Sequence, residues 1–100
     1  INYESIFSEQ LKVKANKNDL LIILSGSGNS KNIIKAIKQA KKMNVLSFGI
    51  IGFNGGKAKK ILDEYIHFET NDMQVVEDLQ MFVIHVCCKW LSQINLNKNK

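Results

Sequence analysis

The sequence predicts an α/β fold: a three-layer αβα sandwich built on a parallel sheet, of the Rossmann or flavodoxin type. Two uninterrupted apolar runs, residues 20–24 and 45–51, are separated by a stretch with helical spacing, and each run leads into a glycine-rich segment. A third, shorter apolar run follows at residues 65–68. Strands that alternate with helices in this way form parallel sheets whose two faces are covered by helices.

The first predicted helix lies within residues 3–13, where apolar side chains recur at helical spacing, at Tyr3, Ile6, Phe7 and Leu11. The polar residues 15–19 predict a turn into the first strand. Residues 20–24, which read LLIIL, are apolar without interruption. Such a run is typical of a strand that is buried on both faces.

A serine- and glycine-rich loop, SGSGNS at residues 25–30, joins this strand to the next helix. Its glycines allow a sharp turn and a close approach of the backbone to a ligand. Free N–H groups at the start of the following helix attract anions, and the serine hydroxyls add donors that suit phosphate oxygens. The loop therefore predicts a phosphate cradle, with an ordinary strand-to-helix turn and a serine N-cap as the alternative. It is neither a Walker A loop nor a G-x-G-x-x-G motif.

The second strand and its turn repeat this arrangement. The helix expected at residues 30–43 has an apolar face opposite its lysines, and Asn44 is suited to end it because asparagine tolerates left-handed backbone. The strand at residues 45–51 contains Gly49, which marks a close backbone approach. A second glycine-rich turn follows at residues 52–56. Because ligands of open α/β sheets bind beyond the carboxyl ends of the strands, the two turns are expected to line one pocket.

The remaining elements are a short helix at residues 57–62, a short strand at residues 65–68 and the longest helix at residues 73–91. The longest helix has a wide apolar face, which predicts either a core helix or a subunit interface. Its members are Val75, Val76, Leu79, Phe82, Val83, Val86 and Trp90. Residues 1–92 are thus expected to form part of a single domain, and residues 93–100 a frayed polar tail rich in Asn and Lys.

Composition narrows the classes of function. The chain is 45% apolar, and no apolar run approaches the roughly 20 residues of a membrane span. There is no apolar leader segment, and the adjacent Cys87 and Cys88 give no disulfide framework, so we expect a cytoplasmic protein in which both cysteines are buried as small apolar residues. The net charge of +5 suits an anionic small substrate. Aromatic residues do not interleave with the lysines, which argues against nucleic-acid binding.

A few ionisable side chains are candidates for acid–base or metal chemistry. His85 lies within the apolar face of the longest helix, so it is either a packed histidine or an acid–base group or metal ligand. Glu77 lies eight positions earlier, which is roughly 12 Å along a helix. Both would serve one small site only if a second copy of the helix contributed one of them. Asp78 is expected to be a solvated helix charge, and His67 to be structural.

Residues 20–57, LLIILSGSGNSKNIIKAIKQAKKMNVLSFGIIGFNGGK, resemble the sugar isomerase (SIS) domain family, and within it the phosphoheptose isomerases. The loop at residues 25–30 is similar to the family pattern S-T-S-G-N-S with Gly26 in place of threonine, and residues 52–56 are similar to G-x-x-G-G. The opening NYESIFSEQL and the later VVEDLQMFVIHVCCKWL also resemble family segments, so the resemblance extends over about residues 3–91. It implies the SIS fold and the C-terminal half of that domain.

The resemblance implies a role for each matching residue. Those that would hold the sugar phosphate are Ser25, Gly26, Ser27 and Ser30. His85 matches a family histidine that transfers protons and, in metal-bound members, ligates zinc. Glu77 stands where the family has a glutamine that contacts substrate or metal; an ionised carboxylate can ligate a metal but cannot donate a hydrogen bond. Another histidine and a catalytic glutamate of the family belong to N-terminal helices outside the matched region.

Two functions follow from the resemblance. The first is an aldose–ketose isomerase that converts sedoheptulose 7-phosphate to D-glycero-D-manno-heptose 7-phosphate for lipopolysaccharide or capsule precursors, as a dimer or tetramer with its site between subunits. It would use no nucleotide cofactor, and a zinc ion would be held by His85 and Glu77. The second is a non-catalytic SIS regulator that binds a phosphosugar or a replication initiator protein. The matching histidine favours the enzyme, and the basic surface leaves the binding role open. With half of the family's catalytic set outside it, the 100-residue chain alone is expected to be inactive.

Overall fold

A parallel sheet of three strands forms the centre of the computed structural model, which describes the backbone of residues 3–98 and the side chains of residues 3–94. The strands β1 (Leu20–Ser25), β2 (Leu46–Ile51) and β3 (Glu64–His67) lie in the order β1-β2-β3. Ser25 pairs with Ile51, which in turn pairs with His67, so the three strands end at the same level. The predicted α/β fold with a parallel sheet is therefore confirmed.

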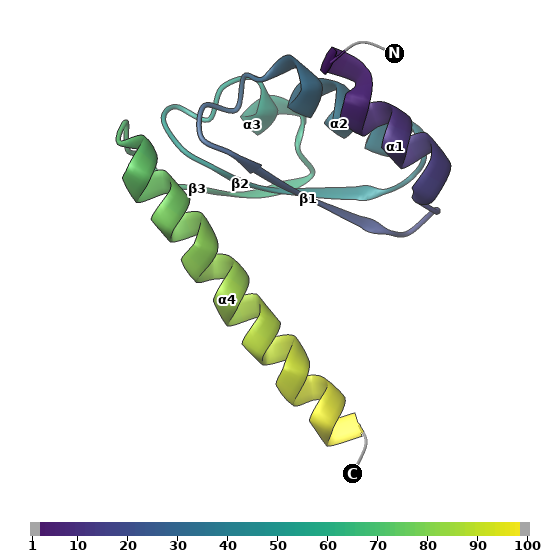
Figure 1. Ribbon diagram of the computed structural model, residues 1–100, viewed down its shortest axis with the longest axis vertical. Coiled ribbons are helices and arrows are strands. Elements are labelled where there is room, and N and C mark those ends of the chain that lie inside the picture. Colours follow the sequence, from purple (N-terminus) through teal and green to yellow (C-terminus); the bar gives the residue numbers. More distant parts are fainter. Residues whose placement is uncertain (1–2, 99–100) are drawn as a thin grey trace.

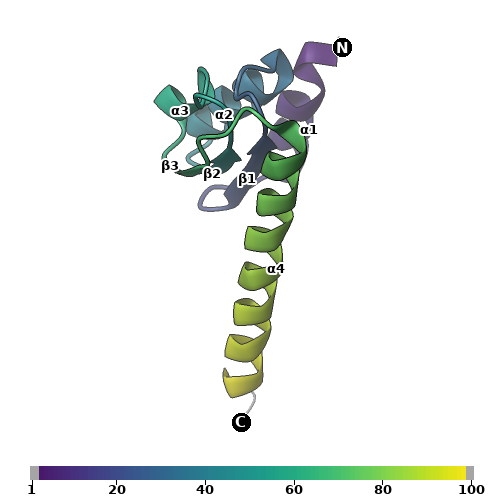
Figure 2. The same cartoon turned by 90° about the vertical axis from the view of Figure 1, so that its left-hand side faces the viewer.

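Three helices and a short 3-10 turn lie on one face of the sheet (Figure 1). They are η1 (Tyr3–Ser5), α1 (Ile6–Lys14), α2 (Lys31–Lys42) and α3 (Ala58–Ile61). The last helix, α4 (Met73–Lys98), begins near the ends of the strands and projects away on the other side (Figures 1 and 2). The second helical layer of the predicted sandwich is thus represented by the start of α4.

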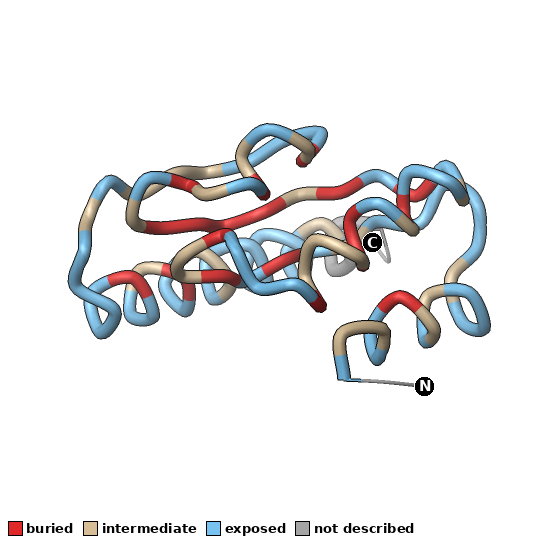
Figure 3. Tube along the Cα trace, turned by 90° about the horizontal axis from the view of Figure 1, so that it is seen from above, coloured by how far each residue is buried: buried red, intermediate tan, exposed pale blue. Residues whose placement is uncertain are grey.

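The core lies between the sheet and the helices α2 and α3, and Figure 3 shows the buried residues gathered along the strands and the facing helices. Its central members are Ile23, Ile37, Ile51, Ala58 and Leu62. Burial of each large aliphatic side chain stabilises the fold by roughly 1.5–3 kcal/mol. Asn44 ends α2 with the expected left-handed backbone, φ 57°. Gly49 marks the expected close approach, because a Cβ there would collide with the Leu62 side chain.

The prediction that β1 is buried on both faces is wrong for the part of the chain that the structure describes. Ile23 and Ser25 face the core and are buried, whereas Leu20, Ile22 and Leu24 on the opposite face are 43–55% exposed. The apolar run indicates which side chains favour burial, but it does not indicate what covers them. In this chain α4 leaves the sheet before it could cover the outer face of β1.

Two residues, Ser47 near the start of β2 and Asp63 just before β3, are hydrogen-bonded to each other at the amino end of the sheet. The Ser47 backbone N–H and hydroxyl donate to Asp63 Oδ2 at 2.9 and 3.1 Å, and the Asp63 N–H donates to Ser47 Oγ at 3.1 Å. The hydrogen bond from the Ser47 backbone lowers the pKa of Asp63 below its ordinary value, against the smaller, opposing effect of partial burial. The Ser47 hydroxyl and the charge of Lys41 lower this pKa further.

The longest helix differs from its prediction in length and in exposure. It begins at an aspartate cap, with the Gln74 N–H donating to Asp72 Oδ1 at 3.0 Å, and continues to Lys98 instead of ending at Leu91. No Gly or Pro lies in residues 92–98 to stop it. Its large exposed apolar residues are Met73, Val75, Met81, Phe82, Val86, Trp90 and Leu91. Among the described residues no helix, α4 included, is both long and apolar enough to cross a membrane.

The prediction that Cys87 and Cys88 are buried is also wrong, because both are exposed on α4. The helix contacts the sheet through its first two turns, where Val76 is fully buried and Gln80 is 7% exposed. The Gln80 side-chain amide donates to the carbonyl oxygen of Ile50 at 2.8 Å, which fastens α4 to β2. Beyond Gln80 most of the helix is exposed, and the described residues leave apolar side chains such as Phe82 and Trp90 uncovered.

Candidate functional site

Two glycine-rich turns meet at the carboxyl ends of β1 and β2, as the sequence predicts. The first, which we call the serine loop, comprises residues 25–30, and the second turn comprises residues 52–56. The Gly52 N–H donates to the carbonyl oxygen of Gly26, and the Ala58 N–H donates to that of Gly28, both at 2.9 Å. Because the strands end at one level, the two turns can pair backbone to backbone.

The turns approach so closely that only glycine fits at two positions. Gly28 has φ 71°, and a Cβ there would collide with the carbonyl oxygen of Gly55. Gly56 has φ 56°, and its Cβ would collide with the carbonyl oxygen of Ser27. Any larger residue would meet both a disfavoured backbone conformation and a backbone oxygen that cannot rotate away.

Ser25 shapes the serine loop from within. Its side chain is 7% exposed, and its Oγ accepts the Gly28 N–H at 2.9 Å. Ser27 is only half-buried, and its Oγ accepts the Asn29 N–H at 3.2 Å. Because a hydroxyl that accepts one hydrogen bond still carries its own proton, Ser27 can donate to an anion while it supports the loop.

Ser30 is the residue of the serine loop whose hydroxyl is most accessible. It is exposed and occupies the N-cap of α2, yet its side chain makes no capping hydrogen bond. The first N–H groups of α2 have no backbone carbonyl partner within the helix, although the Ile33 N–H donates to Asn32 Oδ1 at 2.9 Å. The partial positive charge of this helix end attracts anions. The serine loop therefore supplies what a phosphate monoester needs: hydroxyl donors and a helix N-terminus.

Asn29 is a residue that sequence reasoning missed. Its Oδ1 accepts the Lys57 N–H at 2.9 Å and so ties the serine loop to the residue just after the second turn. Asparagine after glycine in a turn is a signal for side-chain to backbone hydrogen bonding. The sequence could suggest such a bond but not its partner, which lies 28 residues away.

Lysines surround the outer side of this region and make it electropositive. They line a hollow of about 260 Å³ beside Asn29, and the cations involved are Lys31, Lys35, Lys38 and Lys57. Glu4 offsets part of this charge, with its carboxylate oxygens 3.5 Å from Lys31 Nζ and 3.4 Å from Lys35 Nζ. Exposed pairs of this kind add little stability, and they leave a net positive potential that favours an anionic ligand.

His67 supports the second turn, in agreement with its predicted structural role. Its Nε2 lies 2.8 Å from the carbonyl oxygen of Phe53, and Phe53 has the left-handed φ of 51°. A carbonyl oxygen can only accept, so Nε2 carries the proton. The Phe53 N–H donates to the carbonyl oxygen of Thr70 at 2.9 Å, so the strained residue is held from both sides.

The first turn of α4 packs directly against the two turns. A Cβ on Gly26 would lie 2.6 Å from the Met73 sulfur, and a Cβ on Gly52 would collide with Val76. Threonine, which the family pattern has at the position of Gly26, would require Met73 to move. Here the glycine leaves room for the methionine.

His85 and Glu77 are both exposed on α4. His85 follows the start of α4 by twelve residues, roughly 18 Å along the helix axis. It lines an open hollow with Cys88, Lys89, Ser92 and Gln93. His85 is therefore not packed within the described chain, and its role stays a prediction, as does the expectation that Glu77 and His85 serve one site only through a second copy of the helix.

The described residues do not by themselves form a metal centre. They contain no group of three or more His, Cys, Asp or Glu side chains close enough to share an ion. The imidazole of His85 and the carboxylate of Glu77 have the right donor chemistry for zinc, and their exposure leaves both able to bind. Their donor chemistry suits zinc, and the expectation that they share one ion stays a prediction.

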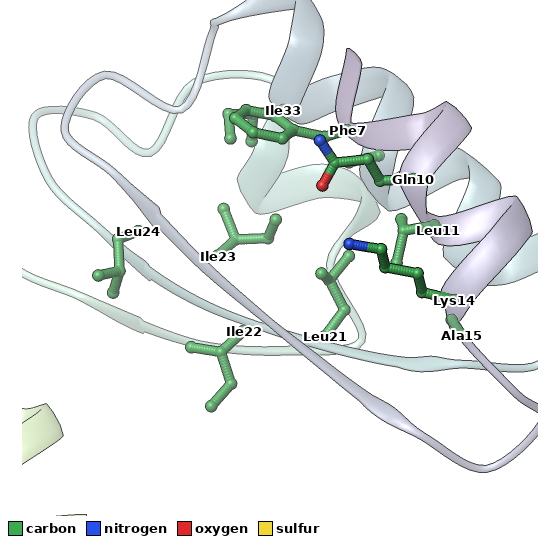
Figure 4. A pocket seen from close by; sticks show the side chains of 11 residues that line it. Phe7, Gln10, Leu11, Lys14, Ala15, Leu21, Ile22, Ile23, Leu24 and Ile33 are labelled. Atoms are coloured by element: carbon green, nitrogen blue, oxygen red, sulfur yellow. The ribbon is translucent and has the colours of Figure 1, made fainter. Parts of the chain in front are cut away.

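An apolar groove lies elsewhere, along β1 beneath α1 (Figure 4). Its volume is about 350 Å³, and apolar side chains dominate its walls, among them Phe7, Leu11, Ile23 and Ile33. None of the serine loop's hydroxyls lines it. A phosphorylated sugar needs many polar partners, so we place the candidate site at the serine loop and not in this groove.

Comparison with known proteins gives a consistent picture. Residues 1–53 match the family model of the SIS domain. The chain is 35% identical over 97 residues to a phosphoheptose isomerase from Helicobacter pylori strain Shi470, a match that covers 97% of this chain and 50% of that protein. It is 33% identical over 91 residues to a phosphoheptose isomerase from Campylobacter jejuni strain 81116, covering 91% and 49%. The chain thus spans about half the length of the curated relatives it matches.

Solved structures show the same relationship. The fold superposes on a phosphoheptose isomerase from Neisseria gonorrhoeae with a TM-score of 0.84 and 27% identity, over 87% of this chain and 50% of that one. It also superposes on a phosphoheptose isomerase from Francisella tularensis with a TM-score of 0.88. There the identity is 21%, over 91% of this chain and 51% of that one, and this second likeness concerns the fold alone.

Proposed function

Because the chain belongs to the SIS domain family, we propose that the full-length protein is a sugar-phosphate isomerase acting on sedoheptulose 7-phosphate. The observation that carries this proposal is the serine loop, pinned by the second turn at the N-terminus of α2. The named relatives, all phosphoheptose isomerases, support the choice of substrate. The product would be D-glycero-D-manno-heptose 7-phosphate.

The serine loop would hold the phosphate, and its residues would divide the work. The hydroxyls of Ser27 and Ser30 would donate hydrogen bonds to phosphate oxygens, because neither hydroxyl acts as a hydrogen-bond donor in the described structure. Ser25 and Gly26 would shape the loop around the anion, the first through its bond to the Gly28 N–H. Anchoring the phosphate fixes the far end of the sugar and so orients the carbons that react.

The reaction needs a base at carbon and a shuttle at oxygen. A base removes a proton from C1 of the ketose to give a 1,2-enediol, and a proton returned to C2 gives the aldose. Meanwhile a proton passes from the C1 hydroxyl oxygen to the C2 oxygen, so no atom is gained or lost. We assign His85 to proton transfer, since imidazole both accepts and donates near neutral pH. The base at carbon would be a glutamate outside the matched region.

A second copy of the chain would complete this site. His85 and Glu77 are exposed, and the same helix presents the apolar residues Phe82, Val86 and Trp90 to solvent. Packing α4 against another subunit would bury these side chains and bring His85 toward a serine loop. We therefore propose a homo-oligomer, a dimer or tetramer, with the site at the subunit interface.

A zinc ion, where bound, would be held by His85 and Glu77 together with groups outside the described residues. Zinc would supply Lewis-acid polarisation of the substrate oxygens. Independently of the metal, the residues of this chain would bind the phosphate and exchange protons at oxygen.

The test is an isomerase assay on the full-length protein with sedoheptulose 7-phosphate, together with calorimetry of sugar-phosphate binding. Ser27→Ala and Ser30→Ala should each weaken binding by about 1–3 kcal/mol, because each removes a donor to a charged group. Ser47→Ala is the matched control, since it removes a serine hydroxyl at the opposite end of the sheet and should lower stability only. Unchanged affinity in both loop variants would mean that the serine loop is an ordinary strand-to-helix turn and does not bind phosphate.

The same assay separates the enzyme from a regulator. Sugar-phosphate binding without turnover, with and without zinc, would exclude the isomerase and leave a non-catalytic SIS protein that senses a phosphosugar. In that case, capture of a replication initiator protein by the assembled oligomer becomes the next measurement.

A further inference from the structure

Two asparagines in the paired turns each accept a hydrogen bond from a backbone N–H, one within its own turn and the other from a distant segment. Asn54 Oδ1 accepts the Gly56 N–H at 2.9 Å, a bond that stays within the second turn. Asn29 Oδ1 accepts the Lys57 N–H at the same distance of 2.9 Å but bridges two segments. The two bonds form a natural comparison between a local turn bond and a bond that joins the turns.

The Asn29 side chain is held between the two turns at close range. A Cβ added to Gly56 would lie 2.6 Å from Asn29 Oδ1, so the glycine is what lets the amide approach. The neighbouring Gly28 carbonyl accepts the Ala58 N–H at 2.9 Å. These adjacent bonds, one from a side chain and one from the backbone, fix both the position and the rotation of the serine loop at Asn29.

Asn29 also lies between the two hydroxyls that we assign to the phosphate. Its own N–H donates to Ser27 Oγ at 3.2 Å, and the residue that follows it is Ser30, the N-cap of α2. A rotation of the peptide at Asn29 would therefore move Ser27 Oγ and Ser30 Oγ together. By contrast, Asn54 lies in the second turn and makes no hydrogen bond to the serine loop among the described residues.

We propose that Asn29 is a positioning residue, which holds Ser27 and Ser30 in the geometry that binds the substrate phosphate by anchoring the serine loop to the Lys57 N–H. The inference rests on the proposed sugar-phosphate function of the serine loop. Asn29 acts through the two serines and through the bond to Lys57. Losing its anchor leaves the donors present but no longer preorganised, which weakens binding of the anion.

The expected kinetic effect falls on KM. Asn29→Ala should raise the KM for sedoheptulose 7-phosphate by about tenfold and leave kcat within about twofold, because anchoring of the phosphate is shared by ground state and transition state. The Kd for inorganic phosphate should rise by a similar factor. Asn54→Ala is the matched control and should leave both values within about twofold, since it removes a bond of equal length that lies within the second turn.

A structural readout accompanies the kinetics. Hydrogen exchange followed by NMR on the free full-length protein should show faster exchange of the Lys57 amide in Asn29→Ala, and unchanged exchange in Asn29→Asp, which keeps an accepting oxygen. Should Asn29→Ala aggregate, Asn29→Ser replaces it, because its shorter side chain stays polar but cannot span the gap to Lys57.

The outcomes separate this inference from the function on which it rests. If wild-type protein shows no turnover but binds inorganic phosphate, the isomerase proposal fails while the phosphate Kd and the Lys57 exchange still test Asn29. If the Lys57 amide becomes exposed in Asn29→Ala while KM and phosphate Kd stay at wild-type values, the positioning role is wrong. Equal loss of affinity in Asn29→Ala and Asn54→Ala would also overturn it, since a bond within one turn would then matter as much.

Discussion

The paired turns and the helix α4 are built on opposite principles. In the turns, residues 25–30 and 52–56 satisfy one another through backbone bonds of 2.9 Å and through glycines that leave no room for a side chain. In α4, Phe82, Val86 and Trp90 are 51–66% exposed and are left uncovered by the described residues. The turns satisfy their own hydrogen bonds within the described residues, whereas α4 leaves apolar side chains exposed.

This difference bears on how the proposed site divides its chemistry. Phosphate anchoring needs donors fixed relative to one another, and the turns provide this from a single chain. Proton transfer by His85 needs the histidine to reach a substrate held elsewhere, and α4 carries it away from the turns of its own subunit. Binding and catalysis should therefore respond differently to substitutions in the two regions.

The largest effect is expected at His85. In the full-length protein, His85→Gln should lower turnover by about 10²–10⁴-fold, the usual loss for a general acid or base, while the melting temperature stays the same because the side chain is exposed. His67→Gln is the control, since that histidine supports Phe53 and should alter stability more than turnover. Turnover and melting curves on the same preparations decide, and an early-melting His85→Gln variant with near-normal turnover per folded molecule would contradict the assignment.

The next largest effect is expected on stability, when glycines of the two turns are replaced. Gly28→Ala should destabilise the protein by about 3 kcal/mol, because it adds left-handed strain to a collision with the Gly55 carbonyl oxygen. Gly55→Ala, with φ 86°, carries similar strain but meets the Lys59 side chain, which can shift, so its loss should be nearer 1–2 kcal/mol, about what left-handed backbone alone costs. Chemical denaturation measures both, and equal losses would mean that the close approach of the turns is unimportant.

A smaller effect is expected on self-association, when exposed apolar residues of α4 are replaced. Phe82→Ser and Trp90→Ser should each weaken self-association of the full-length protein by about 1–3 kcal/mol, because each removes apolar area that only a partner can bury. Lys89→Ser, at an exposed polar position of the same helix, should have no effect. Native mass spectrometry over a dilution series gives the answer. An unchanged oligomer in both variants would place the interface elsewhere.

The smallest effect concerns the Ser47–Asp63 pair, far from both regions. The pKa of Asp63 is lowered in the folded state, so the ionised carboxylate adds stability above its unfolded pKa of roughly 3.9, and this contribution disappears as the pH falls through the lower folded pKa. Asp63→Asn should thus lower stability at pH 7 by about 1 kcal/mol and lower it by less at pH 3. Urea titrations at both pH values test this, and an equal loss at each would show that the charge is irrelevant.

Local patterns predicted what depends on local chemistry. The apolar runs at residues 20–24 and 45–51 identified two strands, and Asn44 and Gly49 identified a helix end and a close approach. The meeting of the two turns followed from the general rule for parallel sheets. These features depend on backbone preferences and on the alternation of strands and helices, which the sequence displays directly.

Features that depend on what covers a surface could not be predicted in the same way. Leu24 and Cys88 are apolar or nearly so, and the pattern of such residues shows which side chains avoid water but not what packs on them. The bond from Asn29 to Lys57 escaped because it requires the register between two distant turns. The roles of His85 and Glu77 stay predictions for a related reason, since the groups that would complete their site lie outside the described chain.

The way α4 is fastened has a mechanical consequence. The helix is held at one end, where Met73 and Val76 fill the space beside the turns and Gln80 bonds to the sheet, and the residues that follow Gln80 extend roughly 27 Å further. A rigid tilt of about 5° around the anchored end would move the far end by about 2 Å but displace the first turn, roughly 5.4 Å long, by less than about 0.5 Å. The distal half of α4 can therefore adjust its position against any surface that it meets, while the serine loop hardly moves.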